Sequence, residues 1–178
     1  KSGGKVGIVD VPTSYYPYTE ISGFFIPGWI GTRRHRIFPP ELIDQLSGLT
    51  DFFQIAIEDV FKEEDELLRD VYKRTDLLYE ILKRLTRESV CDFLLVDFTG
   101  VDRVQHVFWQ YMDRTSRDFK KTAKFKHAIE RYYAKIDSII GDLRDRLDDD
   151  TFMFIVSDHG FGPNYSQFNV NEWLMRKG

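Results

Sequence analysis

Our prediction of the fold starts from one segment, Phe152-Met153-Phe154-Ile155-Val156-Ser157-Asp158-His159-Gly160-Phe161-Gly162-Pro163. It opens with a short run of bulky apolar residues, which is typical of a strand buried in a parallel sheet. The glycines and the proline at its other end favour a turn, so the strand should present Asp158 and His159 from a loop. Because open α/β sheets bind ligands at the carboxyl ends of their strands, we expect a functional site here.

A second Asp/His pair follows another strand-like run. Phe93–Val96 is apolar, and Asp102 and His106 come soon after it at positions i and i+4. On a helix these two side chains share one face and can hold one cation between them. Either pair alone fits a simple hydrogen-bonded contact as well as a metal site. Their shared position, each beyond a predicted strand, strengthens the metal-site hypothesis.

The other acidic and histidine candidates are weaker. His35 lies in the cationic run Arg33–Arg36, which would repel a metal ion, and His127 falls on the solvated face of a predicted helix. Asp97 and His35 are the first residues to consider if a further ligand is needed. The run Asp148–Asp150 fits a solvated connection between a helix and a strand better than a metal site.

Apolar periodicity along the chain predicts alternating strands and helices. The clearest helical stripe includes Leu67, Val71 and Leu78, with Lys and Glu residues on the opposite face. The alternation favours an α/β fold, with a doubly wound, mostly parallel sheet and helices on both faces. The predicted elements are strands at 5–11, 93–96 and 152–156, extended pieces within 21–30, helices at 39–46, 64–85, 103–112 and 121–147, and a last helix around 173–177 capped by Asn169.

Composition excludes several classes of function. The chain has 178 residues, of which 42% are apolar, so one domain with a sizeable core is expected. Its net charge of -4 gives no basic footprint for a nucleic-acid duplex, and no apolar run is long enough to span a membrane. The single cysteine, Cys91, excludes an internal disulfide and a cysteine-rich zinc site. It favours a cytoplasmic location without establishing one, and the oligomeric state stays open.

Two motifs together carry a resemblance to a known family. The stretch Asp102–Trp109, followed further along by Ser157–Pro163, resembles the alkaline phosphatase superfamily. Within that superfamily it is most similar to the type I phosphodiesterase/nucleotide pyrophosphatase branch. The segments Val9–Pro17 and Phe168–Leu174 resemble microbial members of the same branch, so the resemblance spans nearly the whole chain.

The resemblance implies a metal-dependent hydrolase. It implies a doubly wound α/β fold with two divalent ions, usually zinc, about 4 Å apart. Asp102 and His106 would then ligate one ion, and Asp158 and His159 the other. The implied reaction is attack by a Thr or Ser hydroxyl on a phosphodiester or nucleotide pyrophosphate, followed by hydrolysis of the phosphoenzyme. The implied substrate is a small molecule, and Phe161, Trp109 and Tyr111 are candidates to stack on its base.

The resemblance also implies that parts of the family pattern lie outside this sequence. The family's nucleophile and first metal-binding Asp precede the region like Val9–Pro17, and its last metal-binding His follows the Asp-His-Gly motif at a distance. Thr13 and Ser14 align with a structural loop, so neither is expected to be the nucleophile. Residues 1–178 are thus expected to form part of one alkaline-phosphatase-like catalytic domain without its N- and C-terminal portions, and to be inactive alone. A non-catalytic α/β binding module, a sulfatase and a cofactor-independent phosphoglycerate mutase remain alternatives.

Overall fold

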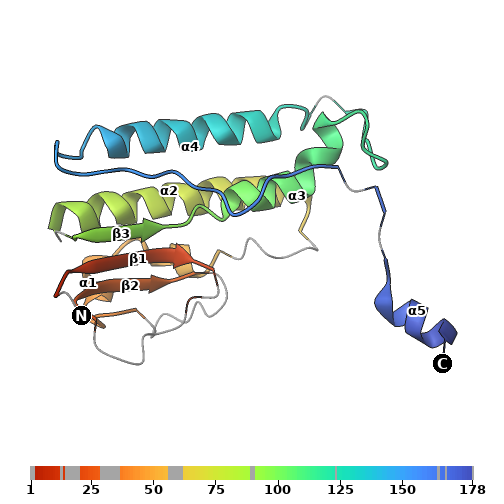
Figure 1. Cartoon of the computed structure of the whole chain (residues 1–178). Helices are drawn as coiled ribbons and strands as arrows, with labels where there is room; N and C mark the ends of the chain where they lie inside the picture. Colours follow the sequence, from red (N-terminus) through yellow and green to blue (C-terminus); the bar gives the residue numbers. More distant parts are fainter. Residues whose placement is uncertain are drawn as a thin grey trace.

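A computed structural model describes most of the chain, namely residues 3–12, 14, 21–28, 37–55, 62–88, 91–122, 124–163, 165–166 and 168–177. Three parallel strands and several helices make up its regular structure (Figure 1). In chain order the elements are β1 (Val6–Val11), β2 (Gly23–Pro27), α1 (Leu42–Gln45), the 3-10 helix η2 (Thr50–Phe53), α2 (Glu64–Glu88), β3 (Phe93–Val96), α3 (Gly100–Met112), α4 (Ala128–Arg144) and α5 (Val170–Lys177).

The sheet has the order β2-β1-β3, and both pairings are parallel. Val9 in the central strand is in register with Ile26 on one side and Val96 on the other. The backbone N–H of Asp97 extends the β3 pairing by donating to the carbonyl of Val9 at 3.1 Å. The predicted α/β class with a parallel sheet is therefore confirmed, and the carboxyl ends of β1 and β3 lie side by side.

Two hydrophobic cores organise the layers, and α2 belongs to both. The first core joins Val9 and Ile26 of the sheet to α1, η2 and the second half of α2, including Leu82. The second core joins the first half of α2 to α3 and α4 through residues such as Phe108 and Tyr132. Figure 1 accordingly shows α2 between the sheet and α4. This arrangement holds the start of α3 at the carboxyl end of β3.

The start of α3 lies close to the ring of Tyr132. Tyr132 is fully buried on α4, and its hydroxyl is 2.6 Å from the Thr75 hydroxyl on α2. A Cβ atom built on Gly100 would overlap the Tyr132 hydroxyl and lie 2.9 Å from Cγ1 of Val71. Glycine at this position therefore lets α3 pack closely against α2 and α4.

Replacing Gly100 with alanine is expected to lower the free energy of unfolding by about 1–3 kcal/mol, because the buried Tyr132 has little room to move. Denaturant unfolding of the purified protein measures this effect. Gly141→Ala is the matched control, since Gly141 lies on α4 with no atom within 4 Å of the added Cβ. That variant should gain up to about 1 kcal/mol from helix propensity. Equal shifts in the two variants would contradict the tight packing at Gly100.

The long helix predicted at 121–147 is shorter in the structure. α4 spans Ala128–Arg144, and Leu147 near the predicted end is 37% exposed. The chain turns before Ala128 because Phe125 enters the second core, where its ring centroid lies 5.0 Å from that of Phe108 and 5.1 Å from that of Tyr111. Packing of one aromatic ring thus overrides the helical pattern of the sequence.

The prediction of a buried strand at Phe152–Val156 is wrong. The segment is extended, but it belongs to no strand, and Phe152, Phe154 and Val156 are each 84% exposed. Figure 1 shows it running back along α4 instead of beside β3. A strand needs a neighbour for its backbone hydrogen bonds. In the described sheet β3 pairs with β1 alone, so its outer edge was open to this segment, but the segment does not join it. An apolar run predicts that a segment can be buried, but it does not specify its neighbour.

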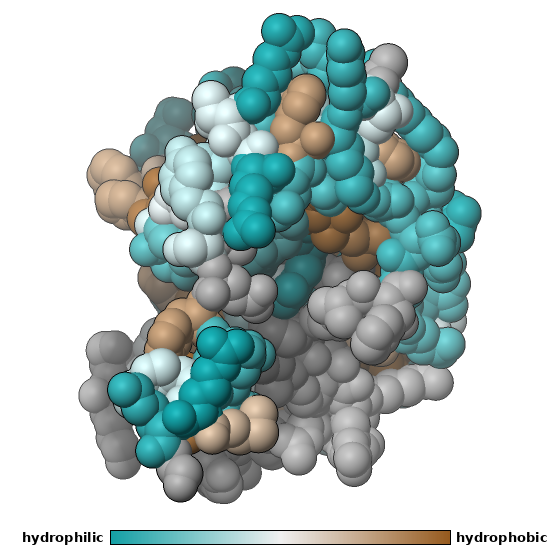
Figure 2. Space-filling model, turned by 90° about the vertical axis from the view of Figure 1, so that its right-hand side faces the viewer, coloured by the Kyte–Doolittle hydropathy of each residue, from teal (hydrophilic) through white to brown (hydrophobic). Residues whose placement is uncertain are grey.

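The C-terminal helix is set apart from these layers. α5 buries none of its residues, and its N-terminus has the predicted cap, in which Oδ1 of Asn169 accepts from the N–H of Glu172 at 3.1 Å. Figure 2, viewed from the side of α5, shows hydrophilic side chains over most of the upper part of this face, with hydrophobic ones between them. No helix in the described part of the chain is long and apolar enough to cross a membrane.

Candidate functional site

The pair Asp102 and His106 lies in the first two turns of α3. Oδ1 of Asp102 is 3.3 Å from Nε2 of His106, and both side chains reach solvent, with exposed fractions of 32% and 58%. Nε of the adjacent Arg103 lies 3.9 Å from Oδ2 of Asp102, which is a long distance for an ion pair. The pair follows β3 directly, because only Asp97–Thr99 separate that strand from α3. It is therefore fixed to the carboxyl edge of the sheet by two regular elements.

The pair Asp158 and His159 lies in the loop that follows the extended segment 152–156. The hydroxyl of Ser157 donates to the carbonyl of His159 at 2.6 Å, and Oδ1 of Asp158 accepts from the N–H of His159 at 3.1 Å. Nδ1 of the His159 ring is 2.8 Å from the carbonyl oxygen of Gly160. Since a carbonyl can only accept, Nδ1 carries the proton in the neutral ring, and Nε2 keeps its lone pair.

The structure brings the two pairs into one region. The ring of Phe161, in the loop that carries Asp158 and His159, lies 4.9 Å from the ring of His106 and 5.3 Å from that of Trp109, both on α3. The bond to the Gly160 carbonyl raises the pKa of His159, and the charges of Asp158 and then Asp102 add to the effect. Residues from both motifs therefore influence each other directly.

Asp97 is a further acidic residue at this position, and the sequence suggested it only as a reserve ligand. Burial raises the pKa of its carboxyl group, and the negative charges of Asp158 and Asp102 raise it further. The Thr99 hydroxyl, which donates to Oδ2 of Asp97 at 2.6 Å, acts in the opposite direction. Its sequence signal was its place as the first polar residue after β3.

The donor chemistry of these residues fits a divalent metal ion. Carboxylate oxygen and imidazole nitrogen are ligands of zinc. Asp102 and Asp158 lie close enough to Asp97 to raise its pKa, and such a group of negative charges favours a nearby cation. The number of ligands is smaller than a catalytic ion requires. Within the residues that the structure describes, no three of the His, Cys, Asp and Glu side chains are grouped so that they could hold one ion. Each pair therefore supplies two ligands at most.

The remaining candidates do not join this region. His127 is half exposed just before α4, and its Nδ1 lies 2.7 Å from Oε2 of Glu130. The hydroxyl of Ser14 donates to the carbonyl of Val11 at 2.5 Å and accepts from the N–H of Gly28 at 3.3 Å, which is a structural role. His35 and Thr13 lie outside the described residues. The aspartates 148–150 are exposed, as the sequence predicted.

The two aromatic candidates on α3, Trp109 and Tyr111, lie in different surroundings. Tyr111 is buried in the second core, where its hydroxyl donates to Oε1 of Glu64 at 2.6 Å. Trp109 is half-buried on another face of the helix, and its Nε1–H donates to Oδ2 of Asp113 at 3.1 Å. Only Trp109 contacts Phe161, so Tyr111 is a core residue and not part of the site.

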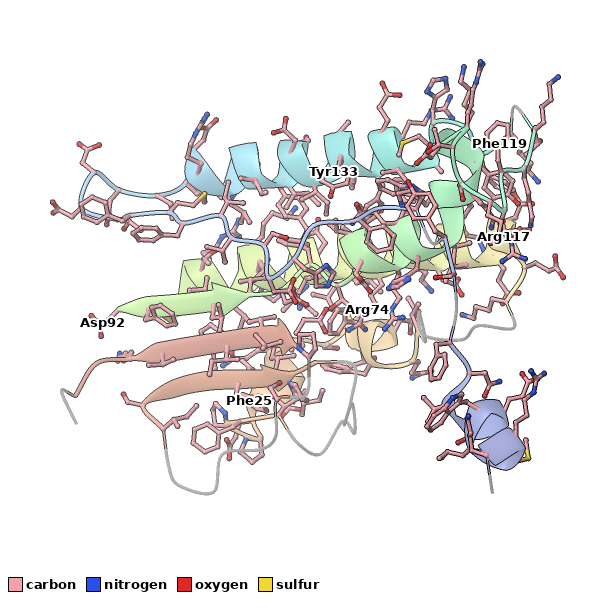
Figure 3. All side chains as sticks on the ribbon, turned by 45° about the vertical axis from the view of Figure 1, so that its right-hand side comes forward. Phe25, Arg74, Asp92, Arg117, Phe119 and Tyr133 are labelled. Atoms are coloured by element: carbon pink, nitrogen blue, oxygen red, sulfur yellow. The ribbon has the colours of Figure 1, made fainter. Side chains whose placement is uncertain are left out.

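A buried ion pair that the sequence patterns did not predict lies beneath the same edge of the sheet. Arg74 of α2 bonds to the carboxylate of Asp10, and both side chains are at least 95% buried. Figure 3 shows Arg74 in the space between α2 and the carboxyl end of β1. Asp10 has a positive φ of 59°. The buried ion pair thus lies at an unusual backbone conformation near the end of the central strand.

Comparison with known proteins gives one match. Neither a curated protein nor a solved structure matches the chain significantly. The family model described as type I phosphodiesterase / nucleotide pyrophosphatase matches residues 1–178, which is the whole of the sequence. The motifs that carried the resemblance, Asp102–Trp109 and Ser157–Pro163, are those that the fold brings together through Phe161. The chain belongs to the type I phosphodiesterase/nucleotide pyrophosphatase family.

Proposed function

We propose that this chain is part of a metal-dependent phosphohydrolase that cleaves phosphodiester or nucleotide pyrophosphate bonds in small molecules. The family is one of hydrolases that are typically metal-dependent. The observation that carries the proposal is the approach of the two Asp/His motifs at the carboxyl end of β3, bridged by Phe161. A binding module would need a pocket at this edge, but it would not need two sets of zinc-type ligands.

In this proposal Asp102 and His106 hold one ion, while Asp158 and His159 hold the other. When bound, such ions activate a nucleophile and stabilise the charge of the leaving oxygen. The chain's own part is to present neutral imidazole nitrogens and carboxylate oxygens in fixed orientations. The Gly160 carbonyl does this for His159, because it holds the proton on Nδ1 and leaves Nε2 to bind.

We place the attacking hydroxyl and the remaining metal ligands outside residues 1–178. Ser14 uses its hydroxyl in two loop hydrogen bonds, which supports a structural role for it. Two ligands per pair fall short of the three that a catalytic zinc takes from its protein. The chain would then form part of a single catalytic domain, and the full-length protein is the one that contains the whole of that domain.

Hydrolysis of bis-p-nitrophenyl phosphate is the direct test. The full-length protein should release p-nitrophenol, lose this activity when a chelator is added, and regain it with zinc. Residues 1–178 alone should show no turnover above background, because this proposal places the nucleophile and a third ligand for each ion outside them. Turnover by residues 1–178 alone would overturn the assignment of the nucleophile. A full-length protein that binds nucleotides without cleaving them would favour the binding-module alternative.

A further inference from the structure

We propose that Phe161 is a positioning residue that fixes the Asp158–His159 pair against the Asp102–His106 pair. The proposal rests on where its ring lies. The Phe161 ring meets the His106 ring edge to face, with an interplanar angle of 87° and a centroid distance of 4.9 Å. It also lies 5.3 Å from the ring of Trp109, one turn further along α3. One side chain of the second motif therefore contacts two residues of the first.

The residues of α3 that contact Phe161 are themselves held in place. Trp109 is half-buried, and its indole N–H is bonded to Asp113 near the C-terminus of the helix. His106 and Trp109 are at positions i and i+3, so they lie on one face of α3 and form a shared surface for the Phe161 ring. Edge-to-face and tilted packing of aromatic rings stabilises such contacts beyond the burial of their area.

Most of the loop around Phe161 is exposed, apart from Pro163, which is also half-buried. The hydrogen bonds made by Ser157, Asp158 and His159 join residues within the loop, so they set its local shape and not its position on the protein. Phe161 is half-buried, whereas its neighbours Gly160 and Gly162 are exposed, and a Cβ on either glycine would meet no atom within 4 Å. The ring of Phe161 therefore anchors the loop to α3.

The consequence for catalysis rests on the proposed function. Ligand groups must be held within about 0.5 Å of their working geometry for tight metal binding. The Asp158–His159 pair has no regular element to hold it, since the segment before it is not a strand of the sheet. Phe161 would supply that constraint without touching an ion or a substrate itself.

The test compares Phe161→Leu with Phe161→Tyr in the full-length protein. Leucine keeps an apolar side chain but removes the ring, whereas tyrosine keeps the ring. In the metal-free protein, the imidazole proton resonances of His106, assigned with His106→Gln, should shift in Phe161→Leu and stay close to their original positions in Phe161→Tyr. Phe168→Leu is the control, because Phe168 is 68% exposed and packs near Trp173 instead of α3.

Zinc affinity, measured by competition with a chelator, gives the second readout. Phe161→Leu should bind zinc about tenfold more weakly, as expected when a residue that orients a ligand is lost, and Phe161→Tyr should restore the affinity. Trp109→Leu removes the α3 ring against which Phe161 packs, so it should also shift the His106 resonances and weaken zinc binding. Unchanged His106 resonances in Phe161→Leu, or unchanged zinc affinity beside shifted resonances, would overturn the positioning role. If the resonances shift while the unmodified protein binds no zinc, the loop anchor stands and the proposed function fails.

Discussion

His159→Ala in the full-length protein is expected to lower phosphodiester hydrolysis by at least about 100-fold. Under the proposed function the substitution removes one direct metal ligand, and the loss of groups that only support metal ligands already costs about 10–100-fold. His159 also contributes an Nε2 lone pair whose availability is set by the bond of Nδ1 to the Gly160 carbonyl. The rate of p-nitrophenol release at saturating zinc measures the effect, with zinc content determined on the same samples.

His127→Ala is the matched control for that experiment. The imidazole of His127 is half exposed and pairs with Glu130 on the adjoining helix α4, away from both motifs. Its removal should change the rate by less than about twofold, since an exposed ion pair contributes little. Similar losses in the two variants would show that the wrong histidines have been assigned to the site.

The elements that the sequence predicted well are those whose pattern depends on local contacts. The strand Phe93–Val96 has the predicted bounds, although it was expected to be buried and its first three residues are exposed. α2 begins at Glu64 and buries Leu67, Val71 and Leu78 as its stripe required. The helical spacing of Asp102 and His106 was likewise readable, because i and i+4 residues meet on any helix. Local periodicity is sufficient for such predictions.

The features that the sequence did not predict depend on partners distant in the chain. The segment Phe152–Val156 has the composition of a strand, but its neighbour cannot be deduced from its own residues. The contact of Phe161 with α3 joins residues more than fifty positions apart, so no periodic pattern in the sequence predicts it. The candidate site was therefore predictable in its ligand types, whereas the way in which its two halves are joined was not.

Arg74 is a case in which the sequence does carry a signal for a distant contact. It lies three residues after Val71 and four before Leu78, at a position that the apolar stripe of α2 turns toward the core. A charged residue at such a position needs a buried partner of opposite charge. Asp10, at the end of an apolar strand, is the corresponding anomaly in the other half of the pair. Two opposite charges inside apolar patterns are therefore candidates for a buried ion pair.

Arg74→Met is expected to destabilise the protein by about 3–5 kcal/mol, because it leaves the buried Asp10 carboxylate without this counter-charge. It also removes the bond from the guanidinium to the Phe52 carbonyl at 2.7 Å and the stacking of the guanidinium over the Phe52 ring at 3.9 Å. A fall in Tm of roughly 6–20 °C should result. Thermal unfolding followed by circular dichroism measures it.

The neighbouring residue provides the control for this last prediction. Lys73 pairs with Asp51 at 3.0 Å, but both side chains are more than half exposed, so Lys73→Met should shift stability by less than about 0.5 kcal/mol. Adding Asp10→Asn to Arg74→Met removes the buried carboxylate charge that has lost Arg74, and should recover part of the loss. Asp10 is the last residue but one of β1 and lies beside Thr99 and Gly100 at the start of α3. Under the proposed function, zinc affinity should therefore fall with stability in Arg74→Met and return with it in the double variant. Equal stability of Arg74→Met and Lys73→Met would mean that the buried ion pair does not stabilise the carboxyl edge of the sheet, beside which Asp102 and His106 lie.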